Sequence, residues 1–218
     1  MIKTGNPFTD FLFTAIVFLP LIPVLLIIGR KLYLEEPLNF LAIICLLGFL
    51  EGISGAYPLV KTDQHILHKV FVVLLFLLLV QAFRSNLGRK VQYGLTILLT
   101  ALLSITLTWW SVRGWGLASP EADMLFNLFL AGVIGISGPA VIRTHQLQIF
   151  RSPLFWMEAG TLFYISLSLL MQWIGPCCQA LEGAQDPEKR LLLALADAVR
   201  YLLYITAVLS FTRSRNVF

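Results

Sequence analysis

Apolar residues occur in seven long runs, separated by short clusters that contain charged residues, Pro or Gly. Each run is about 20 residues long, which is what a helix needs to cross the hydrocarbon core of a bilayer. The runs cover residues 8–29, 38–60, 66–83, 91–112, 123–142, 154–174 and 190–211. The pattern therefore predicts an all-α, polytopic membrane protein: one domain, residues 1–218, forming a bundle of seven transmembrane helices.

Four prolines fall inside these runs: Pro20, Pro23, Pro58 and Pro139. Membrane helices tolerate proline where neighbouring helices satisfy the backbone groups that it leaves free. We therefore expect these prolines to lie within spans and not to end them.

The composition supports the membrane assignment. Hydrophobic residues make up 58% of the 218 residues and charged residues 13%, whereas soluble domains have about 45–50% apolar and about 25% charged residues. So few charges exclude a cytosolic globular enzyme. The connections between the runs are also too short to hold a catalytic, nucleotide-binding or DNA-binding domain.

The distribution of basic residues predicts an orientation in the membrane. The 16 Lys and Arg residues exceed the 12 Asp and Glu residues, but they are scattered, so no basic stripe indicates nucleic-acid binding. Cytoplasmic connections are enriched in Lys and Arg. Nine lie on the side of the C-terminus: Arg30, Lys31, Arg84, Arg89, Lys90, Arg143, Arg151, Arg213 and Arg215. Six lie on the other side: Lys3, Lys61, Lys69, Arg113, Lys189 and Arg190. We expect a multi-pass protein of the inner (cytoplasmic) membrane, with the N-terminus outside and the C-terminus in the cytoplasm.

Four ionisable residues lie beyond the first turn of their spans: Glu51, Glu158, Asp197 and Arg200. Each costs about 2.5–3.5 kcal/mol at the centre of a membrane helix, which disfavours unpaired, lipid-facing positions. Counted from the outer ends of their helices, Glu51, Asp197 and Arg200 all lie roughly 10–15 Å deep. We predict that Arg200 contacts Glu51, Asp197 or both, whereas Glu158 lies near the cytoplasmic end and does not reach them.

Polar residues also recur at helical spacing on four of the spans. Each set forms one stripe of its helix, because residues three or four apart share a face. The stripes are Glu51, Ser54, Gly55 and Pro58; Thr96, Thr100, Ser104, Thr108 and Ser111; Glu158, Thr161, Ser168 and Gln172; and Asp197, Arg200, Tyr201 and Tyr204. We expect all four stripes to face the interior of the bundle and to make it polar.

These stripes and charges predict an outward-opening polar cavity for a small, unidentified ligand. Its candidate lining is Glu51, Ser54, Tyr57, His68, Asn127, Asp197, Arg200 and Tyr204. Arg200 would anchor an anionic group, and the carboxylates would suit a cation or a proton. A buried network that only stabilises the bundle is the alternative interpretation. The pair His65 and His68 lacks a third ligand at fixed spacing, so we predict no metal site and no cofactor.

The segment Pro153-Leu-Phe-Trp-Met-Glu-Ala-Gly-Thr-Leu-Phe-Tyr164 resembles the helix-six signature of a family of uncharacterised bacterial seven-helix membrane proteins. The segment 65–69 resembles the start of that family's third helix, and Glu51 its helix-two acid. Many genes of the family lie beside genes for sensor histidine kinases, so the resemblance implies a role in signalling.

Three function classes remain open from the sequence. We favour a non-enzymatic, receptor-like or partner-coupled protein. It would lie in the lipid bilayer and would associate with a membrane partner protein or with a second copy of itself. A small transporter of a polar solute is the first alternative, because helices one to three weakly echo helices five to seven around a linking helix. An intramembrane enzyme acting on lipid or isoprenoid substrates is the second, with Glu51 or Asp197 as acid or base.

Overall fold

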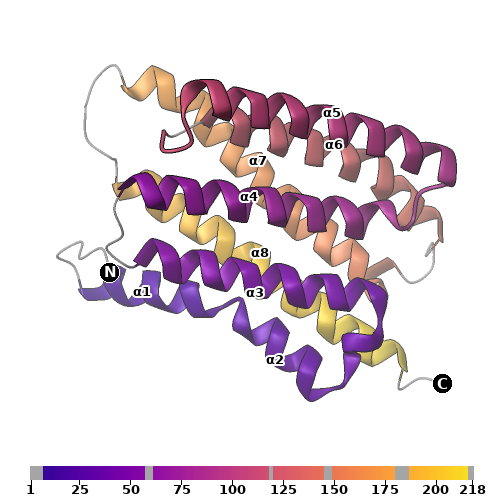
Figure 1. The fold of residues 1–218 in the computed structure, drawn as a ribbon. Coiled ribbons are helices and arrows are strands. Elements are labelled where there is room, and N and C mark those ends of the chain that lie inside the picture. The colour runs from indigo at the N-terminus through magenta and orange to yellow at the C-terminus, as the bar shows by residue number, and fades with distance from the viewer. Residues whose placement is uncertain (1–6, 57–60, 118–119, 145–148, 180–186, 216–218) are drawn as a thin grey trace.

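The computed structural model of the protein describes residues 7–56, 61–117, 120–144, 149–179 and 187–215 (Figure 1). Every regular element in these ranges is a helix. The elements are α1 Pro7–Phe18, α2 Leu21–Gly29, the 3₁₀ turn η1 Leu32–Leu34, α3 Glu36–Ala56, α4 Lys61–Arg84, α5 Arg89–Arg113, α6 Pro120–Thr144, the 3₁₀ turn η2 Ile149–Arg151, α7 Pro153–Gln179 and α8 Pro187–Arg215. They lie side by side in one bundle, and the start of α1 and the end of α8 lie at opposite ends of it (Figure 1).

In the described part of the chain, seven helical segments are long and apolar enough to cross a membrane, which confirms the predicted seven-helix fold class. Each such segment overlaps one predicted run. The first run extends over α1 and α2, and every other run lies within one helix, except that residues 57–60 of the second run lie outside the described residues. The helices extend beyond most runs because apolar residues mark only the part in hydrocarbon. Charged residues such as Arg89 and Lys90 continue the helix past that limit.

Proline has different effects in the first and fifth spans. The first span is one membrane segment but two helices, α1 and α2, because Pro20 has no backbone N–H to continue the hydrogen-bond ladder. Pro23 lies in the first turn of α2, where an N–H has no partner within the helix. Pro139 lies inside α6, which continues past it to Thr144, as expected for a membrane helix.

The apolar core is most complete in the half of the bundle that lies toward the C-terminus. Side chains from the end of the first span, the start of α3, the end of α4 and the start of α7 meet there. Fully buried members include Ile27, Leu32, Leu38, Phe83, Val141 and Met157. This half of the described structure is therefore closed by packed apolar side chains.

The most extensive helix pair is α7 with α8. Gly160 on α7 allows the close approach, since a Cβ there would lie 3.1 Å from both the Arg200 carbonyl oxygen and the Leu203 Cβ. Small residues at such crossings let membrane helices pack backbone to backbone. The crossing fixes the height of Arg200 relative to the polar residues of α7.

Helix α5 lies on the outside of the bundle and is the least buried of the seven spans. The predicted inward stripe Thr96, Thr100, Ser104, Thr108 and Ser111 is exposed, so that prediction is wrong. The physical reason is that hydroxyl groups on a helix can satisfy themselves. Thr100 and Thr108 each donate to the carbonyl four residues earlier, at 2.9 and 2.8 Å, so they need no interior partner.

Lys69 of α4 anchors the corner between α5 and α6. Its side chain is buried, and its Nζ donates to the Trp115 carbonyl at 2.9 Å and lies 5.0 Å from the centre of the Trp110 ring. The corner itself turns at Gly114, whose φ of 101° favours glycine. The positive charge is thus held by carbonyl oxygens and an aromatic face.

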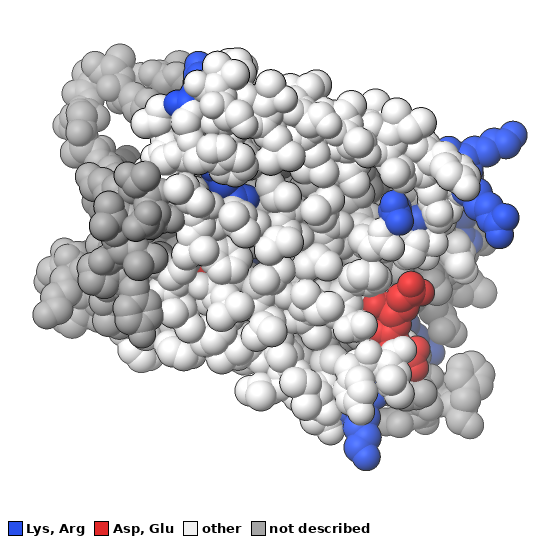
Figure 2. All heavy atoms as spheres, in the orientation of Figure 1, with Lys and Arg blue, Asp and Glu red and all other residues white. Residues whose placement is uncertain are grey.

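The lateral surface has the character of a lipid-facing surface. On the face shown in Figure 2, charged side chains lie mostly toward the ends of the helices, with a broad uncharged band between them. Large apolar side chains are exposed on the described helices, including Ile97 and Ile105 of α5. We therefore describe the protein as a multi-pass membrane protein.

Candidate functional site

A cavity of about 340 Å³ lies in the half of the bundle opposite the apolar core. Its described walls come from α1, α3, α4, α6, α7 and α8. The polar side chains that line it are Glu51, His68, Asp123, Asn127, Thr161, Tyr164, Ser168, Gln172, Asp197, Arg200 and Tyr201. These residues come from the late part of α3, the early part of α4 and α6, and stretches of α7 and α8 that include the middle of each helix. Because successive spans alternate in direction, these parts lie at one face of the bundle, the face of the N-terminus.

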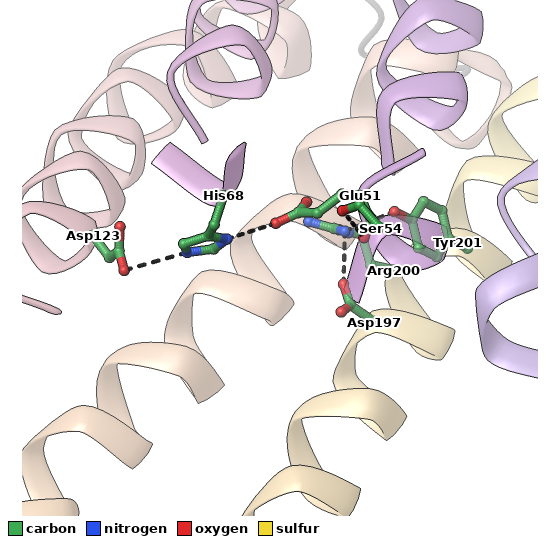
Figure 3. A network of polar contacts seen from close by, with 7 residues as sticks. All are labelled: Glu51, Ser54, His68, Asp123, Asp197, Arg200 and Tyr201. Atoms are coloured by element: carbon green, nitrogen blue, oxygen red, sulfur yellow. Dashed lines mark hydrogen bonds and ion pairs between the residues drawn. The ribbon is translucent and has the colours of Figure 1, made fainter. Parts of the chain in front are cut away.

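His68 bridges two carboxylates from neighbouring helices (Figure 3). Its Nδ1 lies 3.0 Å from Glu51 Oε1 on α3, and its Nε2 lies 3.7 Å from Asp123 Oδ2 on α6. An imidazolium donates from both ring nitrogens, whereas a neutral imidazole donates from one. The arrangement is therefore complementary to a cationic His68 and links three helices across the cavity.

Glu51 and His68 also line a second depression, of about 290 Å³, together with Ser54 and His65. The Ser54 hydroxyl donates to the Glu51 carbonyl oxygen at 2.8 Å. The pair Glu51 and His68 thus lies between this depression and the inner cavity.

Arg200 lies deeper and is held on several sides. Its Nη2 lies 2.6 Å from Asp197 Oδ1 and donates to the Tyr201 hydroxyl at 2.9 Å. The guanidinium carbon lies 4.3 Å from the centre of the Tyr164 ring and 4.8 Å from that of Tyr201. Ring faces attract a cation most strongly where water is excluded. The contact with Asp197 confirms the predicted pairing of Arg200.

The position of Tyr201 depends on a glycine in α3. A Cβ at Gly48 would overlap the Tyr201 hydroxyl, which is the hydroxyl that accepts from Arg200. Glycine at this position therefore creates the space in which the hydroxyl reaches the guanidinium. Asp197 and Tyr201 then flank Arg200 from its own helix, and Tyr164 lies against it from α7.

Amides and hydroxyls complete the wall. Asn127 Nδ2 donates to the Ser168 hydroxyl at 3.3 Å, and the Thr161 and Tyr204 hydroxyls lie 2.8 Å apart. Three buried polar atoms have no hydrogen-bond partner among the described residues: the Arg200 Nε, the Gln172 Oε1 and the Asp197 Oδ1, of which the last has the ion pair with Arg200. Buried polar groups without partners are uncommon and costly, so a bound molecule or water would satisfy them.

The acidic side chains are more accessible than the buried cation. The side chains of Glu51, Asp123 and Asp197 are 30%, 31% and 32% exposed, and that of Arg200 is 14% exposed. A molecule that entered the cavity would therefore meet His68 and the carboxylates before Arg200.

Glu158 is separate from this group, as predicted. It is buried, and its Oε1 accepts from the Ser137 hydroxyl of α6 at 2.6 Å. It lies on the same face of α7 as Thr161, one turn nearer the apolar half.

Most of the predicted site residues are brought together. Glu51, His68, Asn127, Asp197 and Arg200 line the cavity. Ser54 lines the outer depression, and Tyr204 is fully buried behind Thr161. Tyr57 lies outside the described residues.

Asp123 and Tyr164 line the cavity but are not among the residues predicted from the sequence. Asp123 is the first residue of an apolar run, a position typical of a helix end. Its spacing of four from Asn127 places both on one face of α6, and this signal could have identified it. Tyr164 precedes Ser168 by four residues on α7 in the same way.

In the described part of the chain, no group of three or more His, Cys, Asp or Glu side chains is arranged to hold a metal ion. Glu51, His68 and Asp123 form a line instead of converging on one point. The site is therefore a mixed-charge cavity with aromatic walls. Comparison with protein-family models, with curated proteins and with solved structures finds no match for this chain.

Proposed function

We propose that this is a receptor-like, partner-coupled membrane protein that binds a small ligand in the cavity near its N-terminal face. The observation that carries the proposal is the convergence of charged side chains from α3, α4, α6 and α8 on one cavity. Ionisable residues within membrane spans are costly and commonly mark ligand, ion or proton sites. The basic residues favour an orientation in which this face lies outside the cytoplasm.

The one-sided cavity supports reception over transport. Packed apolar side chains such as Phe83 and Met157 occupy the opposite half of the described bundle. A ligand bound from one side can change how the helices pack and so alter a partner's state. The family resemblance, with its implied link to sensor histidine kinases, points to the same class of function.

A small transporter is the second candidate, and one observation favours it. Below the cavity, the pairs Thr161–Tyr204 and Ser137–Glu158 continue a column of polar groups into the apolar half. A transporter needs such groups when its site opens toward the other side.

The ligand-binding proposal can be tested without knowing the natural ligand. Purified protein is screened in detergent against a panel of small cationic, neutral, anionic and zwitterionic solutes, with the thermal transition as readout. We expect hits that disappear in Asn127→Trp, which fills the cavity, and persist in Ser104→Trp on the exposed side of α5. Ser168→Phe provides a second cavity-filling variant if Asn127→Trp does not fold.

The outcomes separate the possible functions. The absence of any hit with the wild-type protein, or hits that survive both cavity-filling variants, would contradict a ligand site in this cavity. Hits that bind but do not cross proteoliposome membranes support a receptor. Saturable flux of a hit, lost in Arg200→Met, would replace the receptor proposal with the transporter.

A further inference from the structure

We infer that the cavity takes a small organic cation with an apolar body, and that His68 occupies the place of this cation when the cavity is empty. The inference rests on the proposed ligand-binding function and specifies its ligand class.

The cavity lining has more negatively charged than positively charged side chains. Three carboxylates line it, those of Glu51, Asp123 and Asp197, against one guanidinium. His68 is the other side chain of the lining that can carry a positive charge. With His68 cationic the lining carries one net negative charge, and with His68 neutral it carries two. Lys69 does not face this space, because its ammonium group is held by the Gly114 and Trp115 carbonyl oxygens.

The guanidinium of Arg200, the group of the site that could bind an anion, already has partners within the protein. Arg200 faces Asp197 at 2.6 Å, donates to Tyr201, and has aromatic rings beside its guanidinium. An anionic ligand would have to displace Asp197 and leave a buried carboxylate without its partner, which is costly. Glu51 and Asp123, by contrast, each form an ion pair with the half-exposed imidazole of His68, and Lys69 acts on Asp123 only as a more distant charge.

His68 is placed where it can be displaced. Its side chain is 49% exposed, the highest exposure in the charged network, and it lies where the cavity meets the outer depression. A cation entering from the N-terminal face would meet the two carboxylates that His68 bridges. It would then exchange with the imidazole, which can turn toward the outer depression.

The remaining walls fit an apolar body beside the charged group. Val72, Leu75 and Phe76 of α4 and Phe126 and Leu130 of α6 line the same cavity. Its volume of about 340 Å³ is near the lower end of ligand pockets, which span about 300–1,000 Å³.

The test uses three molecules of similar size that differ in charge: phenethylammonium, phenethyl alcohol and phenylacetate. Binding to the purified protein is measured by titration calorimetry and by the thermal transition. We expect phenethylammonium to bind at least about tenfold more tightly than the other two. Glu51→Gln and Asp123→Asn should each weaken its binding by about tenfold or more, since each removes one carboxylate partner.

Two further variants make the test specific. Glu121→Gln is the matched control, because Glu121 lies on α6 two residues from Asp123, is 56% exposed and pairs with Arg113 outside the cavity. Its affinity for phenethylammonium should equal that of the wild type. His68→Gln should bind phenethylammonium several-fold more tightly, because the competing imidazole is gone.

Equal affinity for the three molecules would overturn the inference, and so would tighter binding of phenylacetate that depends on Arg200. Weaker binding in His68→Gln would show that His68 contacts the ligand and does not compete with it. If solutes of another charge bind and are lost in Asn127→Trp, the cation inference fails while the proposed function stands. If no solute of any charge binds, both fail.

Discussion

At the scale of single residues, the stability of the site depends on ion pairs between charged side chains within the membrane spans. Arg200 and Asp197 lie in one turn of α8, and each is acceptable in a membrane span because the other is within 2.6 Å. Removing one partner leaves the other as an uncompensated buried charge, whereas removing both leaves none.

We therefore predict that Arg200→Met destabilises the protein by about 3–5 kcal/mol, as breaking a buried ion pair does. The double variant Arg200→Met with Asp197→Leu should recover most of this loss. The measurement is the free energy of unfolding in mixed micelles. Arg113→Met serves as control, because its pair with Glu121 is half exposed and should contribute about 0–1 kcal/mol. A double variant no more stable than Arg200→Met would contradict the pairing.

Gly48 gives a second prediction at this scale. Gly48→Ala should cost about 1–3 kcal/mol, because its Cβ overlaps the Tyr201 hydroxyl and forces a packed ring to move. Gly132→Ala on α6 meets nothing within 4 Å and should be neutral or slightly stabilising. The difference between the two thermal transitions measures the effect. Equal transitions would mean that Tyr201 does not occupy this space.

The sequence located the charged residues of the site better than its other members. Glu51, Asp197 and Arg200 were predictable because ionisable residues stand out against apolar runs. Asp123 and Tyr164 were not, since an acid at a span boundary and a tyrosine within a span are both common in membrane proteins. Their partners are distant in the chain, and helical spacing gives no distance between helices.

At the scale of elements, the apolar runs predicted which segments are helices but not which way their polar faces turn. The hydroxyl stripe of α5 and the polar stripe of α7 both follow helical spacing. The α5 stripe is exposed, yet Glu158, Thr161 and Ser168 of the α7 stripe are buried. Thr and Ser can bond to their own helix, so their spacing does not require a partner. Glu, Asp and Arg cannot be satisfied in this way and must face inward.

This contrast predicts that removing hydroxyl groups from α5 and from α7 lowers the free energy of unfolding by different amounts. The triple variant Thr100→Ala, Ser104→Ala and Thr108→Ala on α5 should change the free energy of unfolding by no more than about 0.5 kcal/mol, as typical surface substitutions do. The single variant Thr161→Ala should cost about 1–3 kcal/mol, because it leaves the buried Tyr204 hydroxyl without its partner. A larger loss in the triple variant would indicate that α5 packs against a partner in the membrane.

At the scale of the whole molecule, the sequence predicted seven spans but not which spans pack against each other. The structure places α4 between α3 and α6, and this order brings His68 within reach of carboxylates on both sides. It also leaves α5 at the outside, although its sequence is as apolar as that of α3. Such adjacency depends on side-chain packing between distant segments, which hydropathy does not encode.

The proposed orientation is a separate prediction at this scale. An odd number of spans places the two termini on opposite sides of the membrane. The nine basic residues on the side of the C-terminus favour the cytoplasm for that side. A reporter fused after Phe218 should therefore be active only in the cytoplasm, and activity outside it would reverse the orientation.

The most direct test of the central claim is the water accessibility of the cavity. Asn127→Cys is introduced into a background in which Cys45, Cys177 and Cys178 are alanine, and sealed vesicles of each orientation are treated with a membrane-impermeant thiol reagent. Val141→Cys, buried in the apolar half of the same helix, is the control. We predict rapid labelling of Asn127→Cys from the N-terminal face alone, and little labelling of Val141→Cys from either face. An Asn127→Cys thiol that is inert from both faces, or that reacts from the face of the C-terminus, would contradict a polar cavity open near the N-terminal face.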